Sequence, residues 1–125
     1  MIMYEVVESK LSEGKLLDAD LVVREIEEVI SDFQLVISLK TTLSTMQGST
    51  HYHLKQGRAS GVLEVTYWPQ ENRLFVEIHG NRLSEWNKHI ILPFSEALAQ
   101  RFAGIVEPKA SAVISPKKPP RPRRQ

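Results

Sequence analysis

Apolar and polar side chains alternate along the centre of the chain. The alternation occupies three runs: His51 to Lys55, Val62 to Trp68 and Arg73 to His79. A period of two is typical of a strand that buries one face. Glycines in the first connection and the sequence Pro-Gln-Glu-Asn in the second favour hairpin turns. The pattern therefore predicts a three-stranded antiparallel meander over about residues 50–79.

The second loop sets the pairing of the last two runs. A four-residue loop pairs Trp68 with Arg73, and counting back places Glu64 opposite Glu77. One face of this hairpin is then wholly apolar, whereas a shift by one residue would mix the two faces. If the first hairpin centres on its loop, His53 lies opposite Glu64. We therefore predict a His-Glu-Glu row across the three strands.

Amphipathic stretches flank the meander. Before it, apolar residues from Val22 to Phe33 lie on one arc at about 100° per residue, and Asp18 or Asp20 can cap this helix. After it, apolar residues recur every four positions from Trp86 to Phe102, and we expect Pro93 to kink this helix or to start a second one. A left-handed turn at Gly104 is expected to end it. The predicted fold is α+β, with amphipathic helices N- and C-terminal to the meander packed on its apolar face.

Residues 34–46 fit two periods. Leu35, Leu39 and Leu43 step by four as in a helix, yet Leu35, Ile37 and Leu39 also alternate as in a strand. We expect a helix, because a glycine follows the stretch and the pattern changes sharply after it. A strand here would lie beside the first run of the meander and change which residues flank its histidines.

Charge divides the chain at Glu107. Residues 1–107 carry ten Lys/Arg and fifteen Asp/Glu, a balance of 10 − 15 = −5, whereas residues 108–125 carry six basic residues and no acid. Five of the seven prolines also lie in the second part, a composition typical of a disordered or polyproline-like segment. We therefore predict a single domain over residues 1–107 and a disordered, basic, Pro-rich tail over residues 108–125.

The composition of the predicted tail suggests two ways in which it could bind a partner. Its basic side chains can neutralise nucleic-acid phosphates or an acidic protein surface. The spacing of Pro116, Pro119 and Arg121 also matches ligands of aromatic grooves. A tail that only aids solubility, or that folds back on the acidic N-terminal region, needs neither mode.

Several classes of protein are disfavoured by composition. The chain has no cysteine, which excludes disulfides, thiolate nucleophiles, cysteine zinc sites and iron–sulfur clusters. Its longest apolar run, residues 90–94, is far shorter than the roughly 20 residues of a membrane span, and its first residues lack the basic region of a signal peptide. No serine lies in a nucleophile elbow and no glycine-rich phosphate loop occurs. We expect a cytoplasmic protein, not associated with a membrane, that leans away from catalysis.

The polar face of the meander carries the candidate chemistry. Our leading interpretation is a small non-catalytic binding or adaptor module without a cofactor, in which this face and the tail engage a protein or a nucleic acid, since aromatic and basic side chains on a sheet face can stack on bases or on a partner. The predicted contact residues are His51, His53, Trp68, Arg73, Phe75, His79, Arg121, Arg123 and Arg124. A solvated face with a Trp68–Arg73 cation–π pair is the plainer reading.

The alternative interpretation is a metal-binding protein or a metal-dependent enzyme. Two carboxylates directly opposite each other repel unless a cation lies between them. That cation could be a protonated His53, a basic side chain such as Arg73, or a metal ion. Imidazole and carboxylate ligands suit a divalent ion such as zinc or manganese. The candidate ligands are His51, His53, Glu64, Glu77 and His79. In either interpretation, a symmetric homodimer is one arrangement that would cover apolar helix surface left over in so short a chain.

Overall fold

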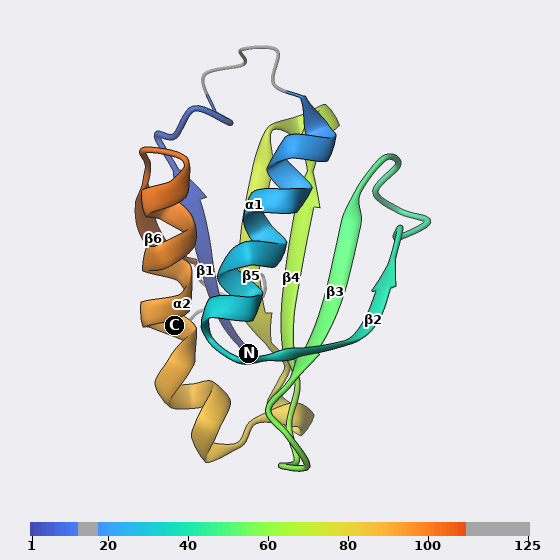
Figure 1. The fold of residues 1–125 in the computed structure, drawn as a ribbon, viewed down its shortest axis with the longest axis vertical. Coiled ribbons are helices and arrows are strands. Elements are labelled where there is room, and N and C mark those ends of the chain that lie inside the picture. The colour runs from blue at the N-terminus through green and yellow to red at the C-terminus, as the bar shows by residue number, and fades with distance from the viewer. Residues whose placement is uncertain (13–17, 110–125) are drawn as a thin grey trace, which may run out of the picture.

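The computed structural model describes residues 1–12 and 18–109. Within these residues, six strands form one antiparallel sheet, and two helices lie on one of its faces (Figure 1). The α+β class is as predicted. The elements in chain order are β1 (Ile2–Val7), α1 (Ala19–Asp32), β2 (Val36–Thr41), β3 (Thr50–Lys55), β4 (Leu63–Trp68), β5 (Arg73–Ile78), α2 (Glu85–Arg101) and β6 (Ile105–Lys109), with short 3-10 turns at Pro69–Glu71 and Gly80–Arg82. The strand order across the sheet is β2-β3-β4-β5-β1-β6.

The predicted meander is confirmed as strands β3, β4 and β5. Trp68 pairs with Arg73 and Glu64 pairs with Glu77, as the loop length indicated. His53 pairs with Glu64 in the neighbouring hairpin. The apolar faces of these strands, which include the fully buried Tyr52 and Val65, form the core beneath the helices.

The expected helix in residues 34–46 is wrong, because this segment contains strand β2. Gln34 has a left-handed φ of 58°, and the backbone N–H of Leu35 donates to the carbonyl of Ile30, which closes α1 before β2 begins. The segment then pairs with β3 from Val36 to Thr41, with a bulge between Ile37 and Leu39. This segment therefore forms a strand rather than a helix, because its backbone can hydrogen-bond to the edge of β3. The spacing of its own apolar residues does not reveal that edge.

The sheet is also wider on its other side than the sequence indicated. Strand β1 pairs with β5 on one side and with β6 on the other. Strand β6 includes Pro108 and Lys109, two residues beyond the predicted domain boundary. The rest of the predicted tail lies outside the described residues.

The two helices largely follow their sequence patterns. Asp18 caps α1 by accepting a hydrogen bond from the backbone N–H of Asp20 at 2.9 Å. Pro93 lies inside one continuous helix, so the option of a second helix there is wrong. The left-handed turn after α2 is at Ala103 rather than at Gly104. A Cβ at Gly104 would lie 2.6 Å from the Cβ of Ser9, so glycine is needed for this close approach of chains. No helix in the described part of the chain is long and apolar enough to cross a membrane.

One buried amide ties the start of α2 to the meander. The Asn87 side chain is fully buried and donates to the carbonyls of Val62 at 3.0 Å and Arg82 at 2.9 Å. Its carbonyl oxygen accepts from the backbone N–H of Ser84 at 2.9 Å. These three bonds hold together the segment that follows β5.

The variant Asn87→Ala is expected to lower the free energy of unfolding by about 2–4 kcal/mol, since it leaves buried backbone groups without partners. The exposed neighbour Asn81 serves as the matched control, and Asn81→Ala is expected to change stability by less than about 0.5 kcal/mol. Urea unfolding of both variants measures the difference. Equal stabilities would contradict this role for Asn87.

Candidate metal centre

The sheet face opposite the helices carries the predicted His/Glu row. His53 pairs with Glu64 and Glu64 pairs with Glu77, and partners directly across antiparallel strands place their side chains on the same face. Val65 and Val76, one position along, are fully buried in the core on the other side. The alternation of each strand therefore directs the row away from the helices.

Three imidazoles converge on one carboxylate oxygen in this face. The Oε1 atom of Glu64 lies 3.3 Å from Nε2 of His51, 3.7 Å from Nε2 of His53 and 3.4 Å from Nε2 of His79. His51 and Glu64 are only 5% and 7% exposed, although neither belongs to the apolar core. The centre of the cluster is thus buried and requires partners for its charges, whereas His53, Glu77 and His79 are partly exposed.

Thr66 orients one of these rings. Its hydroxyl lies 2.8 Å from Nδ1 of His51, on the side of the ring away from Glu64. A hydrogen bond at one imidazole nitrogen fixes the ring and leaves the other nitrogen available, as outer partners do for metal-ligating histidines. Thr66 is itself fully enclosed. Nε2 of His51 is therefore held in place facing Glu64.

The pKa shifts in the cluster follow from burial and from the charges of neighbouring side chains. Burial lowers the pKa of the His53 imidazole, more than the nearby Glu64 carboxylate raises it. Burial alone would raise the pKa of the Glu64 carboxyl, but the interaction with His51 and the other imidazoles outweigh it and hold this pKa below its usual range. Burial raises the pKa of the Glu77 carboxyl, and the Glu64 charge adds to this effect. The cluster thus favours an ionised Glu64 and a neutral His53, the forms that bind a metal ion.

The donor atoms have the spacing of metal ligands. Two sets of three have their donor atoms within 4.8 Å of one another: His51, His53 and Glu64, and Glu64, Glu77 and His79. Ligands of a tetrahedral zinc ion, with bonds of about 2.0–2.1 Å, lie about 3.4 Å apart. The separations of 3.3–3.7 Å at Glu64 Oε1 agree with that distance.

The aromatic and basic residues predicted to contact a partner are engaged within the chain. Arg73 donates to both carboxylate oxygens of Glu5, at 2.9 and 3.0 Å, and its guanidinium carbon lies 4.8 Å from the ring centre of Phe75. Phe75 is only 4% exposed. Trp68 donates its indole N–H to the carbonyl of Gln47 at 2.9 Å. The structure thus places the Arg73 cation over Phe75, and the predicted Arg121, Arg123 and Arg124 lie outside the described residues.

Sequence reasoning missed the role of Glu5. Its carboxylate holds Arg73 across the boundary between β1 and β5, where Glu5 pairs with Phe75. The sequence signal was a weak alternation of apolar and polar residues over residues 2–7. These residues form a strand by pairing with β5, about 70 residues later in the chain. The hydrogen bonds of Arg73 thus go to Glu5, although its charge also acts on Glu77 and partly offsets the rise in the pKa of that carboxyl.

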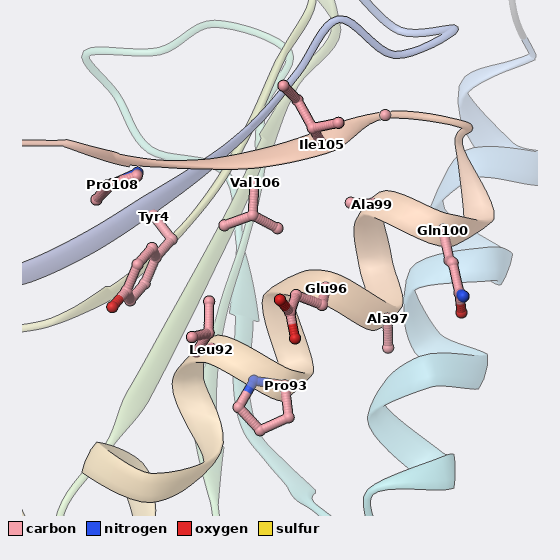
Figure 2. A pocket seen from close by; sticks show the side chains of 11 residues that line it. Tyr4, Leu92, Pro93, Glu96, Ala97, Ala99, Gln100, Ile105, Val106 and Pro108 are labelled. Carbon is pink, nitrogen blue, oxygen red and sulfur yellow. The ribbon is translucent and has the colours of Figure 1, made fainter.

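The structure also contains a cavity of about 870 Å³ on the helix side of the sheet (Figure 2). It lies between α2 and strands β1 and β6, with Tyr4, Leu92 and Val106 around it. The cavity is therefore separated from the His/Glu cluster by the sheet, and Tyr4 and Glu96 are the ionisable side chains that line it.

The pair of facing carboxylates gives a stability prediction for the metal-free protein. The variant Glu77→Gln removes one of two like charges on adjacent strands, so it is expected to raise the free energy of unfolding by about 0.5–1 kcal/mol at neutral pH with a chelator present. Glu96→Gln removes an exposed carboxylate on the opposite side and is the control, with no gain expected. A loss of stability in Glu77→Gln would contradict repulsion within the cluster. Urea unfolding measures both variants.

Comparison with known proteins identifies no relative of this chain. Family models, curated proteins and solved structures were each searched, and none matches the chain. The features that bear on function are therefore those of the site itself: three imidazoles and two carboxylates that meet on one face of the sheet.

Proposed function

We propose that the chain binds a divalent transition-metal ion through His51, His53 and Glu64. The observation that supports this most directly is the convergence of imidazole nitrogens on the Glu64 Oε1 atom at the separations that ligands of one ion have. An ion among these donors would balance the buried Glu64 charge.

The donor set selects the kind of ion. Two imidazoles and one carboxylate suit zinc and similar first-row ions, whereas calcium and magnesium prefer shells made of oxygen. The cluster contains no sulfur ligand, so imidazole is its softest donor. We therefore expect zinc to bind more tightly than magnesium or calcium.

The number of ligands indicates what a bound ion could do. Three protein ligands leave a coordination position for water or for a group from a substrate, which is the arrangement of catalytic rather than structural zinc sites. A bound zinc ion would lower the pKa of that water and polarise a carbonyl or phosphoryl oxygen. Glu77, half-buried beside Glu64, would be the nearest carboxyl group to such a water. A metal-dependent hydrolytic activity is the reaction class that this site would suit.

A protein-binding role draws support from a different feature, the edge strand β2. All six of its residues are exposed, among them the apolar Val36, Ile37 and Leu39. Its charged residue, Lys40, is turned toward α1, with its Nζ atom 2.6 Å from a carboxylate oxygen of Glu27. An edge strand with few free charges can accept a strand from another chain. This second candidate function requires no metal.

Metal binding is tested by titrating zinc into the full chain after removal of all metals with a chelator. We expect saturable binding that raises the melting temperature, with about 2.7 kcal/mol of stabilisation at 100 times the Kd. Glu64→Gln and His53→Gln are each expected to weaken binding about 100-fold or more, because each removes a ligand. Thr66→Val is expected to weaken it about 10-fold, because it frees the His51 ring.

The control for these variants is His89→Gln. His89 is exposed on α2, so this variant retains the cluster and has the same number of histidines as His53→Gln. Zinc binding equal to that of the unaltered chain is expected. An unaltered chain that binds no zinc, or an equal loss in His89→Gln and His53→Gln, would overturn the proposal.

A further inference from the structure

We infer that the site holds two metal ions, bridged by the carboxylate of Glu64. His51 and His53 would bind the first ion, and Glu77 and His79 the second. The inference rests on the proposed function for the first ion and adds a second ion with its own ligands. The ligand class is a pair of divalent first-row cations.

The grouping of the donor atoms carries this inference. The described residues place the five side chains in two sets of three rather than in one set of five, and Glu64 alone belongs to both sets. Its Oε1 atom lies 3.3 Å from His51 Nε2 on one side and 3.4 Å from His79 Nε2 on the other. A carboxylate has two oxygens and about four lone-pair sites, so it can bind two ions at once.

The sheet explains why the donors separate into two sets. Glu64 lies on the central strand β4, with the histidines of β3 on one side and Glu77 and His79 at the end of β5 on the other. Neighbouring strands lie about 4.8 Å apart, so the backbones of β3 and β5 are separated by about 10 Å. Each outer pair therefore reaches the central carboxylate more easily than it reaches the other pair.

The second set of donors contains two carboxylates, whose negative charges a cation would balance. Glu64 and Glu77 are direct cross-strand partners, which is an unfavourable arrangement for two carboxylates without a positive charge between them. Arg73, on the same strand as Glu77, gives its guanidinium to Glu5. Among the described residues, no Lys or Arg forms an ion pair with Glu77, and the positive charges that act on it are those of His79, His51 and the Arg73 engaged by Glu5. A second divalent ion would supply the missing charge, and the two ions together would balance both carboxylates.

Two ions at such a site would act on one ligand together. Bridged ions in two-metal sites are about 3.5–4 Å apart, and they clamp the oxygens of a group undergoing displacement. The ligand expected across the pair is an oxyanion, such as a phosphate ester. Coordination positions left open by the protein would lie on the face of the sheet away from the helices, where His53 and His79 are partly exposed.

The inference is tested with manganese, because two bridged Mn²⁺ ions give an exchange-coupled electron paramagnetic resonance spectrum that isolated ions do not. The full chain, freed of metals, is titrated with Mn²⁺ while bound metal is counted by elemental analysis. Two ions per chain and a coupled spectrum are expected. The double variant Glu77→Gln/His79→Gln is expected to bind one ion with no coupling, and so is His51→Gln/His53→Gln. His89→Gln is expected to behave as the unaltered chain.

The other outcomes separate the two claims. One ion per chain, bound equally well after Glu77→Gln/His79→Gln, overturns the second ion and leaves the proposed function intact. One ion whose affinity falls in both double variants indicates a single site of five donors and also overturns the bridge. Two ions without coupling overturn the bridging role of Glu64. If neither Mn²⁺ nor zinc binds, the proposed function itself fails. Thermal melting of each variant, followed by circular dichroism without metal, checks that the fold is retained.

Discussion

The register between β3, β4 and β5 is the constraint on which the whole site depends. It places Glu64 on the central strand, with His53 directly on one side and Glu77 directly on the other. Because side chains alternate along a strand, a slip of one residue in β4 would turn Glu64 into the core and bring Val65 to the open face. The apolar side of the same strands, including Tyr52, therefore holds the polar side in register.

The charges of the His/Glu cluster are arranged unfavourably in the metal-free protein. Two carboxylates and three imidazoles occupy the middle of a sheet that could carry neutral or well-paired side chains there. Such unfavourable groupings of side chains are expected at functional sites, where the stability of the rest of the structure compensates for them. The compensation here comes from the continuous core under the helices. On the same face, the facing carboxylates of Glu5 and Glu107 each have a basic partner, Arg73 for Glu5 and Lys109 for Glu107. The remaining imbalance lies at Glu64 and Glu77, where we propose that metal binds.

The sequence was most informative where structure is determined locally. Loop length and alternation predicted the meander, its register and the face that carries His51, His53 and Glu64, because each hairpin is closed by neighbouring residues. Strands β1, β2 and β6 were missed, since β1 finds its partners about 70 or 100 residues away and β2 fits two periods equally well. The convergence of three imidazoles on one oxygen atom was also beyond prediction. The alternation predicted that His79 lies on the same face as Glu77, but the approach of its Nε2 atom to Glu64 depends on the side-chain orientation, which a periodic pattern does not give.

The most direct measurement is anomalous X-ray diffraction at the zinc absorption edge, from crystals of the full chain grown with zinc. The account predicts anomalous density beside the Glu64 carboxylate, within about 2.0–2.2 Å of its oxygen and of the His51 and His53 Nε2 atoms. Density only at His89 or at surface carboxylates, with the Glu64 cluster free of metal at saturating zinc, would contradict it.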